Sequence, residues 1–90
     1  MGRPRRAGEL SYRLEFDLVA AGQIPGMPDW AFRVLVAALV QVKADPYQSM
    51  PLRSEEPDDR QVVFGERGLV TFYINKPARL IVVYDVTWTG

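Results

Sequence analysis

The sequence contains no histidine and no cysteine, which excludes much of enzyme chemistry and directs attention to its arginines. Without histidine it lacks the usual general base near neutral pH and the commonest metal ligand. Without cysteine it has no disulfide, no thiolate metal site and no thiol nucleophile. Guanidinium groups remain, and these clamp phosphate groups in a bidentate manner. The first candidates for catalytic residues are therefore Arg60 and Arg67.

The positions of three arginines suggest a shared site. Arg60 opens a predicted strand, Arg67 lies in the turn after it, and Arg79 opens the last strand. Hairpin geometry can gather two of them at one end of a sheet. The alternative is that these side chains are solvated or paired with nearby acids, as turn and strand-end arginines usually are.

A second group of residues is suited to binding RNA or another target. It comprises Arg53, Lys76, Arg79 and Trp88. Trp88 can stack on a base, although an aromatic residue near the end of a strand more often covers the edge of a core or packs against a partner.

Other residues that attract attention have structural interpretations. We expect Tyr73 and Tyr84 to be core or half-core residues, and Trp30 and Phe32 to be core anchors. The adjacent carboxylates at positions 58 and 59 are interpreted as a solvated turn, since no metal-ligand spacing accompanies them. No phosphate-binding glycine loop or nucleophile elbow occurs, and we expect no cofactor and no metal.

The charge is unevenly placed along the 90 residues. Residues 1–8 form a basic leader with Arg3, Arg5 and Arg6, which we expect to be flexible, and residues 9–90 form one domain. From Glu9 onward eight bases face eleven acids, a net charge of −3. A body of this sign lacks a general attraction to nucleic acid, so any RNA contact must rest on a local cluster.

Hydrophobic content of 48% is sufficient for a core, and no secretory signal follows the basic leader. The most apolar stretch, residues 34–40, is too short for a membrane span, which needs about 20 residues. We therefore expect a cytoplasmic protein with no membrane partner.

The periodicity predicts one main helix and four strands. Strict alternation over residues 10–18 predicts a strand, and residues 18–23 can form one short helical turn. Residues 28–43 predict a mostly buried helix, with a central strand as the alternative. Residues 45–59 are predicted to be an irregular connection. Residues 60–64, 69–74 and 79–88 predict three strands joined by hairpin turns.

Such a sheet buries its apolar face by packing the helix across it, which gives a two-layer α+β domain with a four-stranded, mainly antiparallel sheet. In the last strand, alternation places Leu80, Val82, Tyr84, Val86 and Trp88 on one face.

The order of these segments resembles the RelE/ParE toxin superfamily of type II toxin-antitoxin systems. The similar segments are "YRLEF", "LVQVKADPY", "PLR", "DDRQVVFGERGLVTFYI" and "ARLIVVYDVTW", over about seventy residues. The shared marks fall on Asp45, Pro46, Leu52, Arg53, Gly68, Tyr73 and residues 82–86. The resemblance implies a bacterial toxin held by a protein antitoxin.

The sequence departs from this family at the positions that matter for RNA cleavage. Ribosome-dependent members typically have an aromatic residue and an arginine after the turn glycine, whereas Leu69 and Val70 follow Gly68 here. The resemblance therefore implies a toxin that binds its target, as ParE-type members are thought to bind DNA gyrase. The alternatives are a ribosome-dependent mRNA endoribonuclease (an mRNA interferase that inhibits translation) with an arginine-based site, and a non-toxic interaction module.

Overall fold

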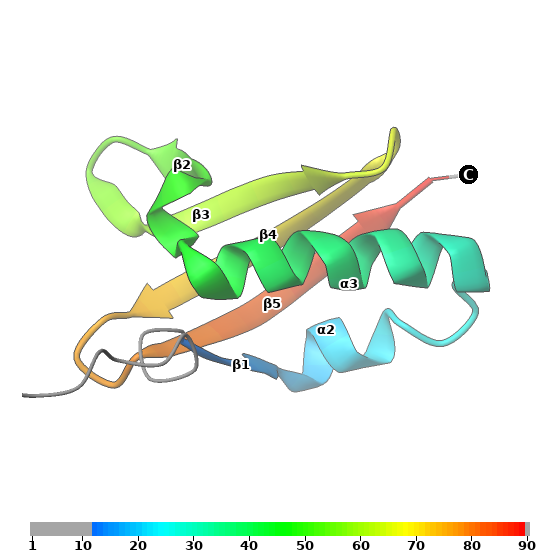
Figure 1. Cartoon of the computed structure of the whole chain (residues 1–90), viewed down its shortest axis with the longest axis horizontal. Helices are drawn as coiled ribbons and strands as arrows, with labels where there is room; N and C mark the ends of the chain where they lie inside the picture. Colours follow the sequence, from blue (N-terminus) through cyan, green and yellow to red (C-terminus); the bar gives the residue numbers. More distant parts are fainter. Residues whose placement is uncertain (1–11, 90) are drawn as a thin grey trace, which may run out of the picture.

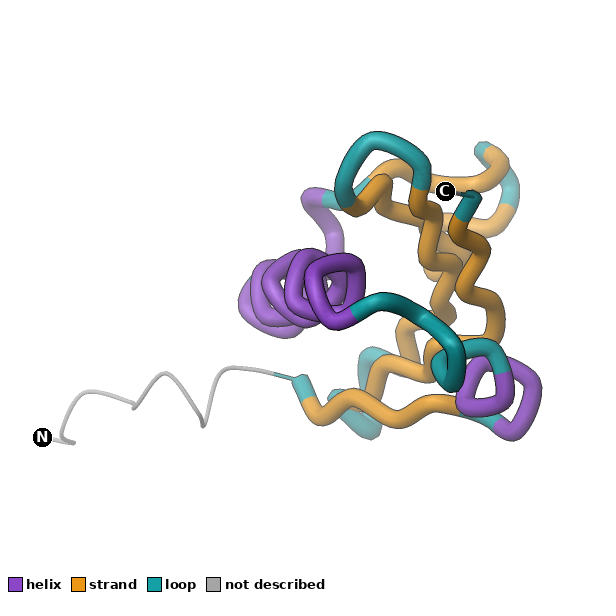
Figure 2. The backbone as a smooth tube through the Cα atoms, turned by 90° about the vertical axis from the view of Figure 1, so that its right-hand side faces the viewer, coloured by secondary structure: helices purple, strands orange, loops and turns teal. Residues whose placement is uncertain are grey.

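The computed structural model describes residues 12–89, so the predicted leader lies outside the described residues. The elements are β1 (Arg13–Phe16), α2 (Leu18–Gly22), α3 (Asp29–Ala44), the short 3-10 helix η1 (Pro46–Gln48), β2 (Met50–Arg53), β3 (Glu56–Phe64), β4 (Gly68–Asn75) and β5 (Leu80–Trp88). The strands form one sheet in the order β1-β5-β4-β3-β2. Figure 1 and Figure 2 show α3 lying across one face of this curled sheet. The predicted two-layer α+β architecture is confirmed.

The predicted four-stranded sheet is wrong in two respects. The sheet has five strands, and β1 pairs with β5 in parallel, while the other neighbours pair antiparallel. The additional strand, β2, falls in the segment predicted to be irregular, and β3 begins at Glu56 instead of Arg60. The composition misled the prediction, because β2 is an edge strand and a sheet edge tolerates a residue such as Pro51.

The first strand is shorter than predicted because an aspartate ends it. β1 covers Arg13–Phe16, and residues 10 and 11 lie outside the described part of the chain. The Asp17 side chain accepts a hydrogen bond from the Ala20 amide at 2.9 Å, which caps α2. The predicted short helical turn at residues 18–23 is thereby confirmed.

The main helix is confirmed, and the alternative of a central strand is wrong. α3 begins at Asp29 after the N-cap Pro28 and buries Ala31, Leu35, Leu39 and Val42. This spacing of four, four and three residues defines a single buried face. Trp30 and Phe32 lie off that face and are 57% and 43% exposed, so the prediction that they anchor the core is wrong. The prediction of a mostly buried helix fails for the same reason.

The core lies between this helix face and the middle of the sheet. Val70, Phe72 and Ile74 of β4 and Ile81 and Val83 of β5 are fully buried against it. Val70 therefore takes a core position on the helix side of the sheet. An arginine there would place a buried charge among hydrophobic side chains.

A β-bulge in β5 overturns the predicted face assignment of this strand. Thr71 pairs with Asp85 while Phe72 pairs with Val83, so Tyr84 is an extra residue on β5. Before the bulge Ile81 and Val83 are buried, and after it the buried residue is Val86. Because the extra residue shifts the alternation by one, a strict period of two predicts the wrong face for half of the strand.

Gln23 holds the end of α2 against the strand just after the bulge. Its side-chain amide donates to Asp85 Oδ1 at 3.0 Å, and its Oε1 accepts from the Val86 amide at 2.7 Å. These bonds join the short helix to β5.

Within residues 12–89, no helix is both long and apolar enough to cross a membrane.

Candidate functional site

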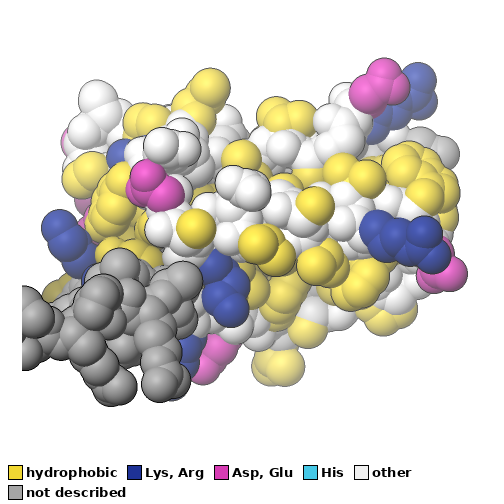
Figure 3. Space-filling model, viewed as in Figure 1, with side chains coloured by type: hydrophobic (Ala, Val, Ile, Leu, Met, Phe, Trp, Pro, Cys, Tyr) yellow, Lys and Arg dark blue, Asp and Glu magenta, His cyan; other side chains and the backbone are white. Residues whose placement is uncertain are grey.

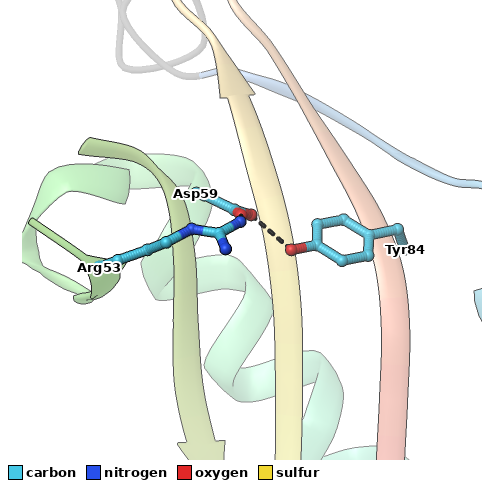
Figure 4. A network of polar contacts seen from close by, with 3 residues as sticks. All are labelled: Arg53, Asp59 and Tyr84. Atoms are coloured by element: carbon cyan, nitrogen blue, oxygen red, sulfur yellow. Dashed lines mark hydrogen bonds and ion pairs between the residues drawn. The ribbon is translucent and has the colours of Figure 1, made fainter. Parts of the chain in front are cut away.

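The sheet face opposite α3, called here the open face, carries a network of three polar side chains. Asp59 in β3 is paired with Tyr73 of β4, whose neighbours Phe72 and Ile74 point into the core, so Asp59 points away from α3. Its Oδ2 accepts from the Arg53 guanidinium at 3.2 Å, and its Oδ1 accepts from the Tyr84 hydroxyl (Figure 4). The network thus joins β2, β3 and β5.

The network orients a cation and leaves no free base. Asp59 is only 8% exposed, and both of its oxygens are occupied. Burial, followed by the hydrogen bond to Asp59, raises the pKa of Tyr84 to about 12, so its hydroxyl remains protonated at neutral pH. The Arg53 side chain is 59% exposed, with donors left to bind an anion. This arrangement is suited to binding a ligand and poorly suited to removing a proton.

The predicted catalytic residue Arg60 is engaged with the backbone. Its Nε donates to the Pro57 carbonyl at 2.8 Å, and its Nη1 donates to the Tyr47 carbonyl at 2.9 Å and to the Ser49 carbonyl. These bonds tie η1 and the start of β2 to β3. Arg60 therefore has a structural role that its sequence position did not reveal.

Two of the basic residues identified in the sequence contact the side chain of Tyr47. The guanidinium of Arg60 lies 5.1 Å from its ring centroid and the ammonium of Lys76 lies 5.7 Å from it. The Tyr47 hydroxyl donates to Asp58 at 2.7 Å. Burial, with the contact to Asp58, raises the Tyr47 pKa to about 12. The Tyr47 ring thus contacts two cations, while its hydroxyl is held by a hydrogen bond.

The interpretation of positions 58 and 59 as a solvated turn is wrong. Both residues lie in β3, and consecutive strand residues point to opposite faces. Asp58 accordingly meets Tyr47, and Asp59 meets Tyr84. The sequence carries no clear signal here, because the strand-forming residues begin only at Val62 and the two adjacent acids are typical of a loop.

Arg67 and Trp88 are brought together at the other end of the β3–β4 hairpin. A pocket of about 390 Å³ separates the turn from the start of α3, and its lining residues are Trp30, Gly65, Glu66, Arg67, Trp88 and Thr89. The Trp30 and Trp88 rings are 5.8 Å apart in an edge-to-face arrangement. Trp88 also packs against the edge of the core, of which Trp30 is not a part, and Arg67 is far along the sheet from Arg60.

Arg79 lies with Lys76 in the turn between β4 and β5. Its backbone φ is 51°, and its guanidinium lies 4.6 Å from the Tyr12 ring centroid. Arg60, Lys76 and Arg79 are therefore near one end of the sheet. Arg60 and Lys76 share the Tyr47 ring, whereas Arg79 contacts Tyr12. Tyr73, predicted to be core or half-core, is 43% exposed on the open face, whereas Tyr84 is partly buried.

The open face is not positively charged. The strands place Arg13 and Arg53 there together with Glu15, Asp59 and Asp85. Since the carboxylates offset the guanidinium groups, the face offers no general attraction to a phosphate backbone. Among residues 12–89, no three acidic side chains gather closely enough to hold a metal ion.

Comparison with known proteins shows the fold. The sequence matches no protein-family model and no curated protein. Its structure is similar to that of an E. coli RelE toxin mutant in complex with an antitoxin RelBc peptide, with a TM-score of 0.76, 20% identity, and coverage of 89% of this chain and 85% of the other. The RelBE2 toxin-antitoxin complex of Mycobacterium tuberculosis gives a TM-score of 0.69 at 18% identity, with 88% and 99% covered.

An archaeal RelE-RelB complex from Pyrococcus horikoshii is also similar, with a TM-score of 0.68, 13% identity, and 89% and 97% of the two chains covered. These similarities span nearly the whole described chain. The fold is therefore that of RelE toxins, which confirms the fold implied by the resemblance seen in the sequence.

Proposed function

We propose that this chain is the toxin of a type II toxin-antitoxin pair, and that it inhibits growth by binding its target and is neutralised by a protein antitoxin. The observation that carries the proposal is the agreement of its fold with RelE toxins, several of which were solved together with RelB antitoxins. Because fold similarity at this identity leaves the chemistry open, the mode of action must be argued from the site itself.

Binding is favoured over RNA cleavage by the state of the polar groups. Cleavage at a phosphate requires a base that activates the attacking hydroxyl and cations that stabilise the developing charge. Asp59 is held by two partners, Tyr84 is protonated, and Arg60 is engaged with three carbonyl groups. The open face therefore supports docking on a target, for which DNA gyrase and the ribosome are the candidates.

One observation favours a second candidate, a ribosome-dependent mRNA endoribonuclease. Arg53 is exposed and fixed in orientation by Asp59, and within the described residues the Arg67 side chain forms no ion pair. A ribosome could supply the missing base, so Arg53 would bind the phosphate and Arg67, Arg79 or Lys76 would contact RNA.

The two modes are separated by inducing the chain in bacterial cells and mapping transcript ends on ribosomes. We expect growth arrest without new transcript ends, relieved by co-expression of the protein encoded by the adjacent reading frame. Arg53→Ala should relieve growth arrest. Arg33→Ala, at an exposed position of α3, is the matched control.

Discrete new ends that disappear in Arg53→Ala would instead establish the endoribonuclease. Unchanged growth in cells that express the folded chain would refute the toxin proposal. The non-toxic interaction module would then be the remaining alternative. Arg60→Ala is unsuitable here, because it removes bonds that hold η1 and β2 in place.

A further inference from the structure

The flank of α3 next to β1 carries an exposed stripe that no described element fully covers. It consists of Asp29, Phe32, Val36, Val40 and Lys43, called here the outer stripe. Spacings of three, four, four and three residues place them on one side of the helix. Phe32, Val36 and Val40 are 43%, 41% and 57% exposed. Figure 3 shows hydrophobic side chains gathered along this side of the molecule.

The outer stripe borders a groove between α3 and β1. The groove has a volume of about 270 Å³, and Leu14 and Phe16 of β1 form its far wall. Lys43 is the charged residue of its lining, and the remaining side chains are apolar. Contiguous exposed apolar surface of this kind marks an interaction site in soluble proteins.

The outer stripe is self-complementary about Val36. Phe32 and Val40 lie four residues on either side of Val36, and Asp29 and Lys43 lie seven residues on either side. If a second α3 is laid antiparallel with the two Val36 side chains opposed, each Asp29 faces Lys43 of the other copy, and each Phe32 faces Val40. A two-fold interface requires this reciprocity. Antiparallel helix dipoles add a favourable contribution.

We propose that the outer stripe is the docking surface for a second copy of this chain, which forms a two-fold dimer with antiparallel α3 helices. A helix from a different protein would need apolar residues, but nothing would require the acidic and basic ends to be equidistant from Val36. Residues 1–11 are basic and would bring arginines toward Lys43, so their charge disfavours them as the occupant.

The expected dimer is weak and leaves the open face accessible. Three apolar side chains per copy are less than the roughly 800 Å² per partner of a stable interface, so dissociation in the micromolar range or weaker is expected. Since α3 and the Arg53–Asp59–Tyr84 network lie on opposite sides of the sheet, both networks face outward in the dimer. The inference does not depend on the proposed toxin function.

A single introduced thiol tests the two-fold axis directly. The chain has no cysteine, so Val36→Cys provides one thiol per copy, positioned opposite its equivalent across the axis. Mild oxidation of the full chain should yield a covalent dimer. Ala37→Cys, which is exposed on α3 but outside the outer stripe, is the matched control and should remain mostly monomeric.

Exchanging the charges at the two ends of the outer stripe tests the proposed contacts between Asp29 and Lys43 of the two copies. In sedimentation experiments over a concentration series, Asp29→Lys or Lys43→Asp alone should raise the dimer dissociation constant about tenfold, because symmetry repeats each unfavourable contact. The double variant Asp29→Lys/Lys43→Asp restores opposite charges and should return close to the native value. Circular dichroism confirms that each variant is folded.

Each other outcome overturns the inference. A native chain that is monomeric at all concentrations excludes the dimer. A dimer that forms only after residues 1–11 are deleted also counts against the inference, because the full chain would then be monomeric. Equal crosslinking of Val36→Cys and Ala37→Cys, or a double variant as weak as the single ones, places the contact elsewhere. Growth arrest is a separate readout, so loss of the proposed function would leave these results unaffected.

Discussion

Replacing Gly68 with alanine should destabilise the domain through one identifiable collision. A Cβ atom on Gly68 would lie within 2.6 Å of Cζ, Cε1 and Cε2 of the Phe64 ring, whereas carbon atoms pack at about 3.5–4.0 Å. Phe64 is only 2% exposed, so its ring cannot move into solvent. The ring must instead displace core neighbours, or β3 and β4 must separate at the pair next to the turn, Phe64 and Gly68.

Overpacking of this kind costs about 1–3 kcal/mol. In a domain of this size each kcal/mol lowers Tm by about 4–8 °C, so Gly68→Ala should be plainly visible by thermal and urea unfolding. Gly22→Ala is the matched control, because no atom lies within 4 Å of the added Cβ and α2 gains a better helix former. It should be neutral or stabilising by up to about 1 kcal/mol.

Repeating the Gly68→Ala substitution in a Phe64→Leu variant tests whether the collision with the ring causes the loss of stability. Phe64→Leu removes the three ring atoms that collide, so in that background Gly68→Ala should cost less than about 1 kcal/mol. If Gly68→Ala costs the same with Phe or Leu at position 64, or no more than Gly22→Ala, the collision is not the reason for the glycine.

Three further predictions concern the polar groups. Tyr84→Phe removes a hydrogen bond to the buried carboxylate of Asp59 and should lower the free energy of unfolding by about 1–3 kcal/mol, whereas Tyr73→Phe should stay within about 0.5 kcal/mol; equal urea midpoints would contradict this. Asp17→Ala removes the N-cap of α2 and should cost about 1 kcal/mol by the same assay; an unchanged urea midpoint would contradict the role of the cap. The folded-state pKa of Tyr47 and Tyr84 is raised to about 12, against about 10 when unfolded, so their contribution to stability is full below about pH 10 and is lost as pH rises through 12. Tyrosinate absorbance should therefore rise later in native than in urea-unfolded protein, and coincident titrations would contradict the burial.

The candidate site was only partly predictable, because its contacts join residues distant in sequence. Arg53 was identified as a binding residue, but its partner Asp59 was interpreted as part of a solvated turn. Tyr84, which donates to Asp59, was interpreted only as a core or half-core residue. The Asp59–Tyr84 contact spans 25 residues and exists only because β4 aligns β3 with β5. A run of β-branched and aromatic residues predicts a strand, but it does not predict which side chain of another strand lies opposite.

The sequence by itself determined the elements that depend on local interactions. The period of α3, the alternation around β1 and the hairpin turns at residues 65–68 and 75–78 are properties of neighbouring residues, and they predicted the helix and four of the five strands. The absence of histidine and cysteine is read directly from the sequence. Tertiary structure decided the parallel pairing of β1 with β5, the edge strand β2, the bulge at Tyr84 and the exposure of Trp30 and Phe32. Each of these depends on how strands and helix pack together, because register and burial are set by the partner surface and local periodicity carries no information about that surface.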